Sequence, residues 1–500
     1  MAETFHNLLL GFSVSLAPLN LFYCFVGVLL GTVVGVLPGL GSAATIALLL
    51  PITFHMPATS AIIMLAGIWY GSMYGGSTTS ILLRIPGEAA SVMTCVDGFE
   101  MARQGRAGAA LGIAAFGSFI AGTVGVVGLM FLGPPLAEFA LEFGPPEYFA
   151  LTTLGLTLVS YLGSKSVPKA LSMAVVGLLL GTVGLDPVRS AERFTFGSLS
   201  LQGGIELVPM VIGLFGLAEV FLMLDRRWRV EDVVRTPTGL LDLLPTRQDW
   251  RDSAGAIARG TLIGFLVGVL PGAGATISSF VAYALEKRRS RHPERFGTGA
   301  IEGVAAPEAA NNSATAAGFV PLLTLGIPGN VVTALMLGAF LLHGITPGPT
   351  LLTQRPEMFW GVVTSMYVGN VMLLILNIPL IGLFTRIARV PASILGPLIV
   401  LVCLAGTYGV NNNPIDLLVM VAFGVACYLM TKLGYDPAPL VLGFVLGPMV
   451  EMSLRQSLIL SQGSFLIFFG RPIAGVLLGL ALFMVMSQLF HTATKAVRTR

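Results

Sequence analysis

The stretch Gly35-Val36-Leu37-Pro38-Gly39-Leu40-Gly41 interrupts a long apolar run, and it recurs almost unchanged as Gly268-Val269-Leu270-Pro271-Gly272-Ala273-Gly274. Proline removes a backbone donor and clashes with the preceding helical turn, and glycine permits backbone angles that other residues resist. In hydrocarbon every freed N–H and C=O must find a partner, so such a break persists only inside protein or beside a polar cavity. Two breaks in matching halves predict a transport site. The alternative is a pair of kinked, tightly packed helices without a ligand.

The composition is that of a protein embedded in a membrane. Of the 500 residues, 55% are hydrophobic and 11% are charged, whereas soluble proteins carry about 25% charged residues. We expect an all-α polytopic membrane protein with about twelve transmembrane helices and shorter broken or re-entrant pieces, because about 20 apolar residues cross a bilayer. The net charge of +3 bears on orientation in the lipid bilayer, and no nucleic-acid partner is expected.

Neither the cysteines nor the N-terminus indicates another class of protein. The four cysteines are far apart and include no CxxC pair, so we expect no disulfide framework and no metal site beyond a transported Na+. The first apolar run has no Lys or Arg before it, which argues against a cleaved signal peptide. No cofactor is expected.

The chain divides into two repeated halves. The longest charged stretch, 225–254, is interpreted as a cytoplasmic connection between a first membrane repeat, 1–224, and a second, 255–500. The repeat extends beyond the breaks, since Ile85-Pro86-Gly87 recurs as Ile327-Pro328-Gly329 in the same order. Matches that keep their order, with spacings that drift only by loop lengths, indicate a duplicated protein.

The positions of the basic residues predict that the two halves are inverted. Cytoplasmic loops of membrane proteins collect Lys and Arg. Both flanks of the second break are basic, with Arg247 and Arg251 on one side and 287–289 on the other, whereas no Lys or Arg occurs before Arg84. Equivalent hairpins would therefore enter the membrane from opposite faces, as an inverted repeat requires. The C-terminus is expected in the cytoplasm.

Two polar tracts at membrane depth, 75–80 and 311–315, supply candidate ligands for the substrate. Hydroxyls and amides can replace the hydration shell of a carboxylate or a small cation, and broken-helix N-termini add N–H donors. The alternative is that these small polar residues join helices to one another. The candidate substrate-binding residues are Gly39, Gly41, Ser42, Ser77, Thr78, Thr79, Gly272, Gly274, Asn311, Asn312, Ser313 and Thr315.

Ionisable residues inside apolar segments are candidates for coupling. An ionisable group within a membrane is a functional hypothesis by default. Arg84 directly follows the first tract and could neutralise a substrate carboxylate, although capping a helix at the interface is the interpretation we favour. Glu308 lies three residues before Asn311 and could carry a coupling proton or help to bind a cation. For Asp186 and Asp436, each followed by proline, a turn at a helix end is favoured.

Signatures of enzymes are missing. The chain contains no G-x-x-x-x-G-K-[ST], no G-x-S-x-G and no H-E-x-x-H, so neither direct use of ATP nor hydrolase chemistry is expected. A secondary transporter driven by an ion gradient is the leading interpretation. A carboxylate or ion channel and a membrane-embedded enzyme remain the alternatives.

The combined motifs of both halves resemble the large membrane subunit of tripartite tricarboxylate transporters, and the resemblance covers nearly the whole chain. The residues that carry it are both breaks, the stretch from Tyr74 to Glu88, Asp97-Gly98-Phe99, the stretch from Gly105 to Gly112, the stretch from Gly303 to Asn312, and Leu325-Gly326-Ile327-Pro328-Gly329.

The resemblance implies a transport system with several components. Its members work with a small membrane subunit of about four helices and a periplasmic solute-binding protein, and they import citrate or other carboxylates across the bacterial inner membrane. The resemblance also implies that a Na+ or H+ gradient drives uptake and that the binding protein largely selects the solute. The two broken hairpins, at Pro38 and Pro271, would meet near the midplane in an alternating-access scheme.

Overall fold

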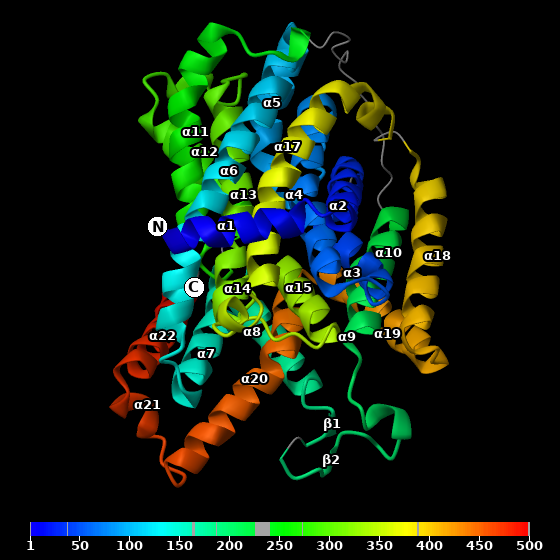
Figure 1. The fold of residues 1–500 in the computed structure, drawn as a ribbon, viewed down its shortest axis with the longest axis vertical. Coiled ribbons are helices and arrows are strands. Elements are labelled where there is room, and N and C mark those ends of the chain that lie inside the picture. The colour runs from blue at the N-terminus through cyan, green and yellow to red at the C-terminus, as the bar shows by residue number, and fades with distance from the viewer. Residues whose placement is uncertain are drawn as a thin grey trace.

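The computed structural model describes residues 2–37, 39–162, 166–186, 188–225, 241–272, 274–387 and 390–498, and these are almost entirely helical (Figure 1). Two short strands, β1 (Gly184–Leu185) and β2 (Glu192–Arg193), pair antiparallel. The helices of the first half are α1 Ala2–Ser15, α2 Pro18–Val36, α3 Gly41–Thr53, α4 Ala58–Leu83, η1 Ala89–Ser91, α5 Val92–Met101, η2 Ala102–Arg106, α6 Ala107–Ala140, α7 Pro145–Leu162, α8 Val167–Leu180, η3 Leu199–Leu201, α9 Leu207–Val211, η4 Ile212–Leu217 and α10 Ala218–Asp225.

The second half has the same helical character. Its helices are η5 Leu241–Leu243, α11 Arg247–Gly268, α12 Gly274–Arg289, η6 Pro293–Arg295, α13 Glu302–Ala317, α14 Phe319–Leu325, α15 Val331–Leu342, α16 Leu351–Gln354, α17 Pro356–Ile387, α18 Ala392–Asn411, α19 Pro414–Lys432, α20 Ala438–Leu460, α21 Ile467–Gly470 and α22 Pro472–Arg498. Residues 226–240, half of the predicted connection between the halves, lie outside the described part of the chain.

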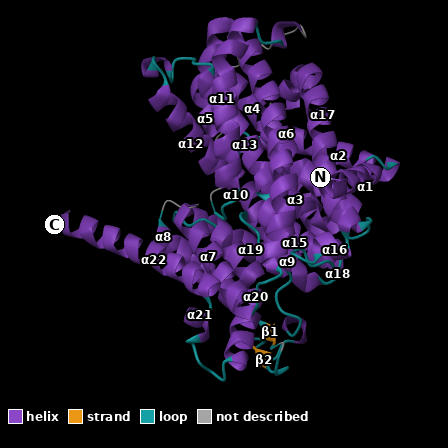
Figure 2. Cartoon of the chain, turned by 60° about the vertical axis from the view of Figure 1, so that its left-hand side comes forward, coloured by secondary structure: helices purple, strands orange, loops and turns teal. Residues whose placement is uncertain are grey.

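The prediction of an all-α membrane protein is confirmed. Among the described residues, 7 helices are long and apolar enough to cross a membrane, and four shorter apolar helices accompany them. The expected count of about twelve and the inverted orientation stay predictions. Both views place α11 and α12 toward one end of the molecule and the β1–β2 hairpin at the other, and Figure 2 shows α22 extending away from the rest.

Both predicted breaks lie between separate helices. In the first half, α2 ends at Val36 and α3 begins at Gly41, and in the second half α11 ends at Gly268 and α12 begins at Gly274. Gly39 and Gly41 have φ of 94° and 54°, and their counterparts Gly272 and Gly274 have φ of 86° and 54°. These left-handed angles are the ones that glycine adopts most easily. Pro38 itself lies outside the described residues.

The duplication also appears in how the helices pack. On α2, Gly27, Gly31 and Gly35 each contact the backbone of α4, where an added Cβ would collide with Met64, Ile68 and Ser72. The same spacing recurs between α11 and α13, where Gly260, Gly264 and Gly268 face Ala306, Ala310 and Ala314. Such small-residue seams bring two membrane helices into close backbone contact. The helices on the far side of the seams are buried along most of their length, α4 from Ser60 to Leu83 and α13 from Gly303 to Ala317.

Widening one of these seams should destabilise the protein. In a Gly264→Val variant the added side chain meets the backbone of Ala310, so we expect a loss of about 1–3 kcal/mol in the free energy of unfolding, as for other overpacked cores. Thermal unfolding of the purified protein in detergent measures it. The matched control is Gly479→Val on α22, where an added Cβ meets no atom within 4 Å. Equal melting temperatures for the two variants would contradict the close seam.

A network of ion pairs fastens the β1–β2 hairpin to α20. Arg455 donates hydrogen bonds of 3.0 and 2.7 Å to the two carboxylate oxygens of Asp186, and Glu451 lies 2.6 Å from Arg193 and 2.7 Å from Arg455. The Asp186 carboxylate also accepts the backbone N–H groups of Val188 and Arg189. Asp186 therefore forms a turn, as its position before proline predicts, but the turn directly follows β1 and does not lie at the end of a helix.

The hairpin should detach from α20 in acid. The hydrogen bonds from Arg455 hold the pKa of Asp186 well below its ordinary value. A carboxylate whose pKa is lower in the folded protein contributes stability above its unfolded pKa, near 3.9, and this contribution is lost as the pH falls toward its folded pKa. At pH 7 we expect the hairpin to be cleaved faster in Asp186→Asn than in the wild type. The difference between the two cleavage rates should close below about pH 3. Limited proteolysis of the hairpin across pH tests this, and a gap that widens in acid would contradict it.

Candidate functional site

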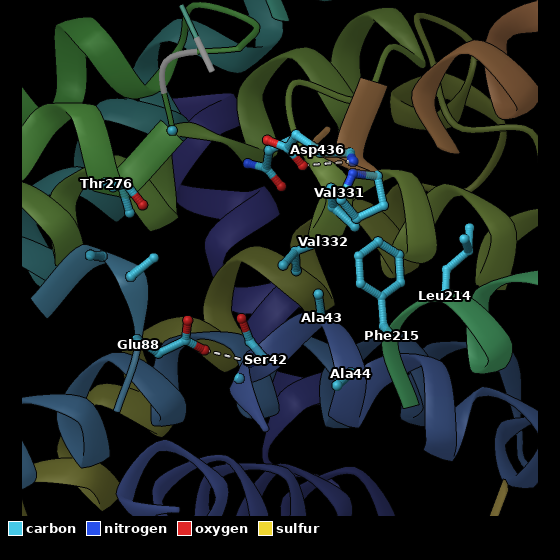
Figure 3. Close-up of a pocket in the computed structure, with 18 of the residues that line it drawn as sticks. Ser42, Ala43, Ala44, Glu88, Leu214, Phe215, Thr276, Val331, Val332 and Asp436 are labelled. Atoms are coloured by element: carbon cyan, nitrogen blue, oxygen red, sulfur yellow. Dashed lines mark hydrogen bonds between the residues drawn. The ribbon is translucent and has the colours of Figure 1, made fainter. Parts of the chain in front are cut away.

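The two breaks meet at one cavity of about 750 Å³, shown in Figure 3. Residues from both halves of the chain form its wall, and most of them belong to the breaks, to the turns that follow α4 and α14, and to the first turns of helices. The lining residues include Gly39, Leu40, Gly41, Ser42, Ala43, Ala44, Glu88, Ala89, Ala90, Gly272, Gly274, Ala275, Thr276, Ile277, Gly329, Asn330, Val331, Val332, Asp436, Pro437, Ala438 and Pro439.

Several helices begin at this cavity. The first turns of α3, α12, α15 and α20 all contribute to its wall. The first N–H groups of a helix have no partner within the helix, and the helix dipole places partial positive charge at that end. A cavity ringed by helix N-termini is therefore suited to anionic groups such as carboxylates.

Two capping turns in equivalent positions of the repeat border the cavity. Glu88 and Ser91 form a reciprocal capping box at the start of η1, and Asn330 and Thr333 form the same box at the start of α15. The residue that ends the preceding helix is left-handed in both halves, with φ of 57° at Arg84 and 70° at Gly326. The two turns therefore share one backbone design but present different side chains.

Glu88 is the point at which the two halves differ in charge. Its carboxylate accepts a hydrogen bond from the backbone N–H of Ser42, in the first turn of α3, as Figure 3 shows. In the second half the equivalent position holds Asn330, whose side chain accepts the N–H of Thr333 at 3.0 Å. The N-terminus of α3 is thus occupied by the carboxylate of Glu88, whereas the equivalent residue near α12, Asn330, carries a neutral amide.

The sequence-predicted residues fall into two groups. Five of them line the large cavity: Gly39, Gly41, Ser42, Gly272 and Gly274.

The residues of the two polar tracts lie elsewhere, buried within α4 and α13. Ser77 and Thr78 line a second cavity of about 20 Å³, and Asn312 and Thr315 line a third of about 10 Å³. Thr79, Asn311 and Ser313 are hydrogen-bonded to Gly76, Glu308 and Thr261 respectively.

Contact between the tracts and the substrate stays a prediction. The large cavity is lined instead by polar residues that were not among the candidate substrate ligands, namely Glu88, Glu219, Thr276, Asn330 and Asp436, the last of which was expected only to form a turn at a helix end. A signal for two of them was present. Glu88 and Asn330 each follow a repeated Ile-Pro-Gly and precede a hydroxyl residue by three positions, which is the spacing of a capping box.

Glu308 lies at the centre of the packed region and is fully buried. Its carboxylate accepts hydrogen bonds from Ser77 at 2.6 Å, from Thr94, and from Asn311 at 3.3 Å. These donors are neutral, and among the described residues no Lys, Arg or His forms an ion pair with it. A buried carboxylate of this kind needs a proton or a cation to offset its charge.

Arg84 does not line the large cavity. It ends α4 in the left-handed conformation, and its guanidinium lies 5.6 Å from the centre of the Phe99 ring. The side chain is exposed. This placement agrees with the helix-end interpretation of Arg84, and its role as a charge partner stays a prediction.

Comparison with known proteins decides the family. Residues 21–442 match the model described as "Tripartite tricarboxylate transporter TctA family". The chain belongs to this family. The match extends over both breaks, both capping turns and both polar tracts, so all the features of the site lie within the part that defines TctA proteins. The family is one of multi-pass membrane subunits of tripartite transporters.

Two relatives of this TctA chain come from Agrobacterium vitis. The "Uncharacterized 52.8 kDa protein in TAR-I ttuC' 3'region" is 51% identical over 490 residues, which cover 98% of this chain and 97% of the relative. The "Uncharacterized protein in TAR-II ttuC' 3'region" is 50% identical over 226 residues, which cover 45% of this chain and 93% of the relative. No solved structure matches the chain.

Proposed function

We propose that this chain moves a carboxylate through the bacterial inner membrane by alternating access, driven by a Na+ or H+ gradient. A periplasmic solute-binding protein delivers citrate or a related carboxylate, and a small membrane subunit of about four helices completes the system. Membership of the TctA family supports the class of transporter. The observation that carries the proposal is the convergence of both duplicated breaks on one cavity ringed by helix N-termini.

The N-terminus of α12 is the best place for a substrate carboxylate. Its first turn, 274–277, lines the cavity and offers backbone N–H groups together with the hydroxyl of Thr276. Asn330 lines the same cavity with an amide, in the position where the first half has Glu88. The cavity of about 750 Å³ is of the size of small-molecule sites in proteins, about 300–1,000 Å³.

The charges on the wall support coupling to a cation. Glu88, Glu219 and Asp436 line the cavity, and no Lys, Arg or His is among its lining residues within the described chain. A substrate with several carboxylates entering such a wall meets repulsion unless cations or protons enter with it. The substrate and the coupling ion would then be bound together, as symport requires.

The two hairpins are packed differently, which supports the alternating-access part of the proposal. On α3, Leu48 is 7% exposed and lies against Gly216 of η4 and Gly406 of α18. The equivalent residue of α12, Val281, is 43% exposed. We infer that the two hairpins exchange these environments during transport, so that α12 becomes covered when α3 is released.

This exchange predicts reciprocal changes in cysteine labelling. In a background without the four native cysteines, Val281→Cys should react with a thiol reagent at least about tenfold faster than Leu48→Cys in the state described here. Adding substrate and coupling ion should slow labelling at 281 and accelerate it at 48. A variant with cysteine at Gly479, on the distant helix α22, is the control. Parallel changes at 281 and 48 would contradict the exchange.

Reconstituted uptake tests the proposed function. Proteoliposomes would contain this chain and its small membrane subunit, with the binding protein and a radiolabelled carboxylate added outside. We expect accumulation that requires the binding protein and either an inward Na+ gradient or an inward H+ gradient. Flux that only equilibrates the solute would indicate a channel. Absence of flux across a panel of di- and tricarboxylates, with a folded complex, would reject carboxylate transport.

A further inference from the structure

The cavity of about 20 Å³ beside Glu308 is built from three helices. Its lining residues are Tyr74, Ser77 and Thr78 of α4, Leu111, Ala114 and Ala115 of α6, and Asn377 and Ile381 of α17. It shares no lining residue with the large cavity. A space of about 10–15 Å³ is enough for one water molecule or one small ion, so this cavity has room for a single occupant.

Two of its polar side chains have atoms without a hydrogen-bond partner. The phenolic oxygen of Tyr74 and the side-chain oxygen of Asn377 are both buried and unpaired, in residues that are 3% and 4% exposed. The amide nitrogen of Asn377 donates to the carbonyl of Leu373 at 2.9 Å, which leaves its oxygen as the free group. Buried polar atoms in native proteins nearly always have partners, so an unpaired pair around one cavity calls for an occupant.

One hydrogen bond links the wall of this cavity to the carboxylate of Glu308. The Ser77 hydroxyl lines the cavity and donates its hydrogen to the Glu308 carboxylate at 2.6 Å. Because that hydrogen is used, the lone pairs of the Ser77 oxygen remain for another partner. The cavity wall thus offers neutral oxygen atoms, and one of them, the Ser77 hydroxyl, is hydrogen-bonded to a buried carboxylate. The described lining includes no basic residue.

We propose that this cavity binds one Na+ ion, held by the side-chain oxygens of Tyr74, Ser77, Thr78 and Asn377, with Glu308 supplying the balancing charge. The ion would be the coupling cation. This role in coupling rests on the proposed function, whereas the binding of Na+ does not. One carboxylate balances the whole charge of a monovalent cation, and Ca²⁺ would need about 6–8 oxygen ligands, more than these four side chains supply. Among the described residues, no group of three or more His, Cys, Asp or Glu forms a metal cluster. A water molecule is the competing occupant.

Thermal unfolding of the purified full chain tests the proposal without substrate or binding protein. We expect NaCl to raise the melting temperature above that in KCl or choline chloride at equal ionic strength, because a ligand that binds only the folded state stabilises it. Thr78→Val keeps the size of the side chain and replaces its hydroxyl with a methyl group. Asn377→Leu keeps the branched shape but removes the whole amide, including the nitrogen that donates to Leu373. Each should raise the Na+ concentration for half-maximal stabilisation about tenfold or more, equivalent to losing one contact of about 1.4 kcal/mol.

A matched control separates loss of a ligand from loss of packing. Thr152→Val removes a buried hydroxyl on α7 that bonds only within its own helix, to Tyr148 at 2.7 Å and Phe149 at 3.1 Å. It should leave the response to Na+ unchanged. Tyr74→Phe is a further variant of the site and should also weaken the response to Na+. It replaces Asn377→Leu in the test if that variant does not fold.

The outcomes are distinguishable from those for the proposed function. Equal melting temperatures in Na+ and K+, or an unchanged Na+ response in Thr78→Val and Tyr74→Phe, would overturn the ion site and leave a cavity for water. Normal Na+ binding in a protein that transports no carboxylate would instead reject the proposed function. Uptake that is driven only by protons, with no Na+ binding, would reject this inference alone.

Discussion

Replacing Asn330 with aspartate should reduce carboxylate uptake by about a hundredfold, because like charges brought together in a binding site cost several kcal/mol and each 1.4 kcal/mol is tenfold. Asn330 lines the large cavity at the turn that precedes α15. The substitution changes one atom, and aspartate caps a helix as well as asparagine does. It therefore adds negative charge to the wall near the start of α12 and leaves the fold intact.

The control for this variant is another capping asparagine. Asn413 caps α19, where its side chain accepts the N–H of Ile415 at 3.0 Å; it is half-buried and does not line the large cavity. Asn413→Asp should keep normal uptake. Initial rates in proteoliposomes, with protein amount and melting temperature matched, measure both variants. Normal uptake by Asn330→Asp would show that the substrate carboxylate binds elsewhere.

Replacing Glu308 with glutamine should abolish accumulation against a gradient. The carboxylate is fully buried and receives hydrogen bonds only from neutral donors in the described structure. Its negative charge is therefore available to balance a proton or a cation, and glutamine keeps the shape without the charge. Removing one member of a buried charge pair costs about 3–5 kcal/mol, so we expect the driven uptake rate to fall at least about a hundredfold.

Glu302→Gln is the comparison for Glu308→Gln, since Glu302 lies in the first turn of the same helix and is only half-buried. It should accumulate substrate as the wild type does. The measurement is the steady-state ratio of substrate inside and outside the vesicles. A Glu308→Gln protein that still concentrates its substrate would exclude this carboxylate from coupling.

The backbone of the site follows from the sequence more directly than its side chains do. The two glycine-rich breaks could be located because Gly39, Gly41, Gly272 and Gly274 sit in left-handed conformations that few other residues adopt. Proline and glycine act within a few residues, so their effect can be inferred locally. Burial of the polar tracts was also predictable, because polar groups at membrane depth must face protein or water.

The wall of the cavity depends on contacts between distant parts of the chain. Glu88 reaches the N–H of Ser42 across 46 positions, and α20 contributes its first turn from a segment far beyond both breaks. Periodicity indicates that one face of a helix is polar but does not say which helix will cover it. For that reason the contacts of Ser77 and Asn311 with Glu308 could not be predicted. Their contact with the substrate stays a prediction.

The burial of α13 has a consequence for how the protein is made. This helix carries Glu308, Asn311 and Asn312, and it is not among the described helices apolar enough to cross a membrane. Insertion of a nascent helix from the translocon depends on its hydrophobicity, so α13 is a poor substrate for insertion alone. Its polar face is covered by α6, where the Ser118 hydroxyl accepts a hydrogen bond from Asn312 at 2.8 Å, and by the glycine seam of α11. We therefore expect α13 to enter the membrane together with the helices that cover it, α6 and α11 among them.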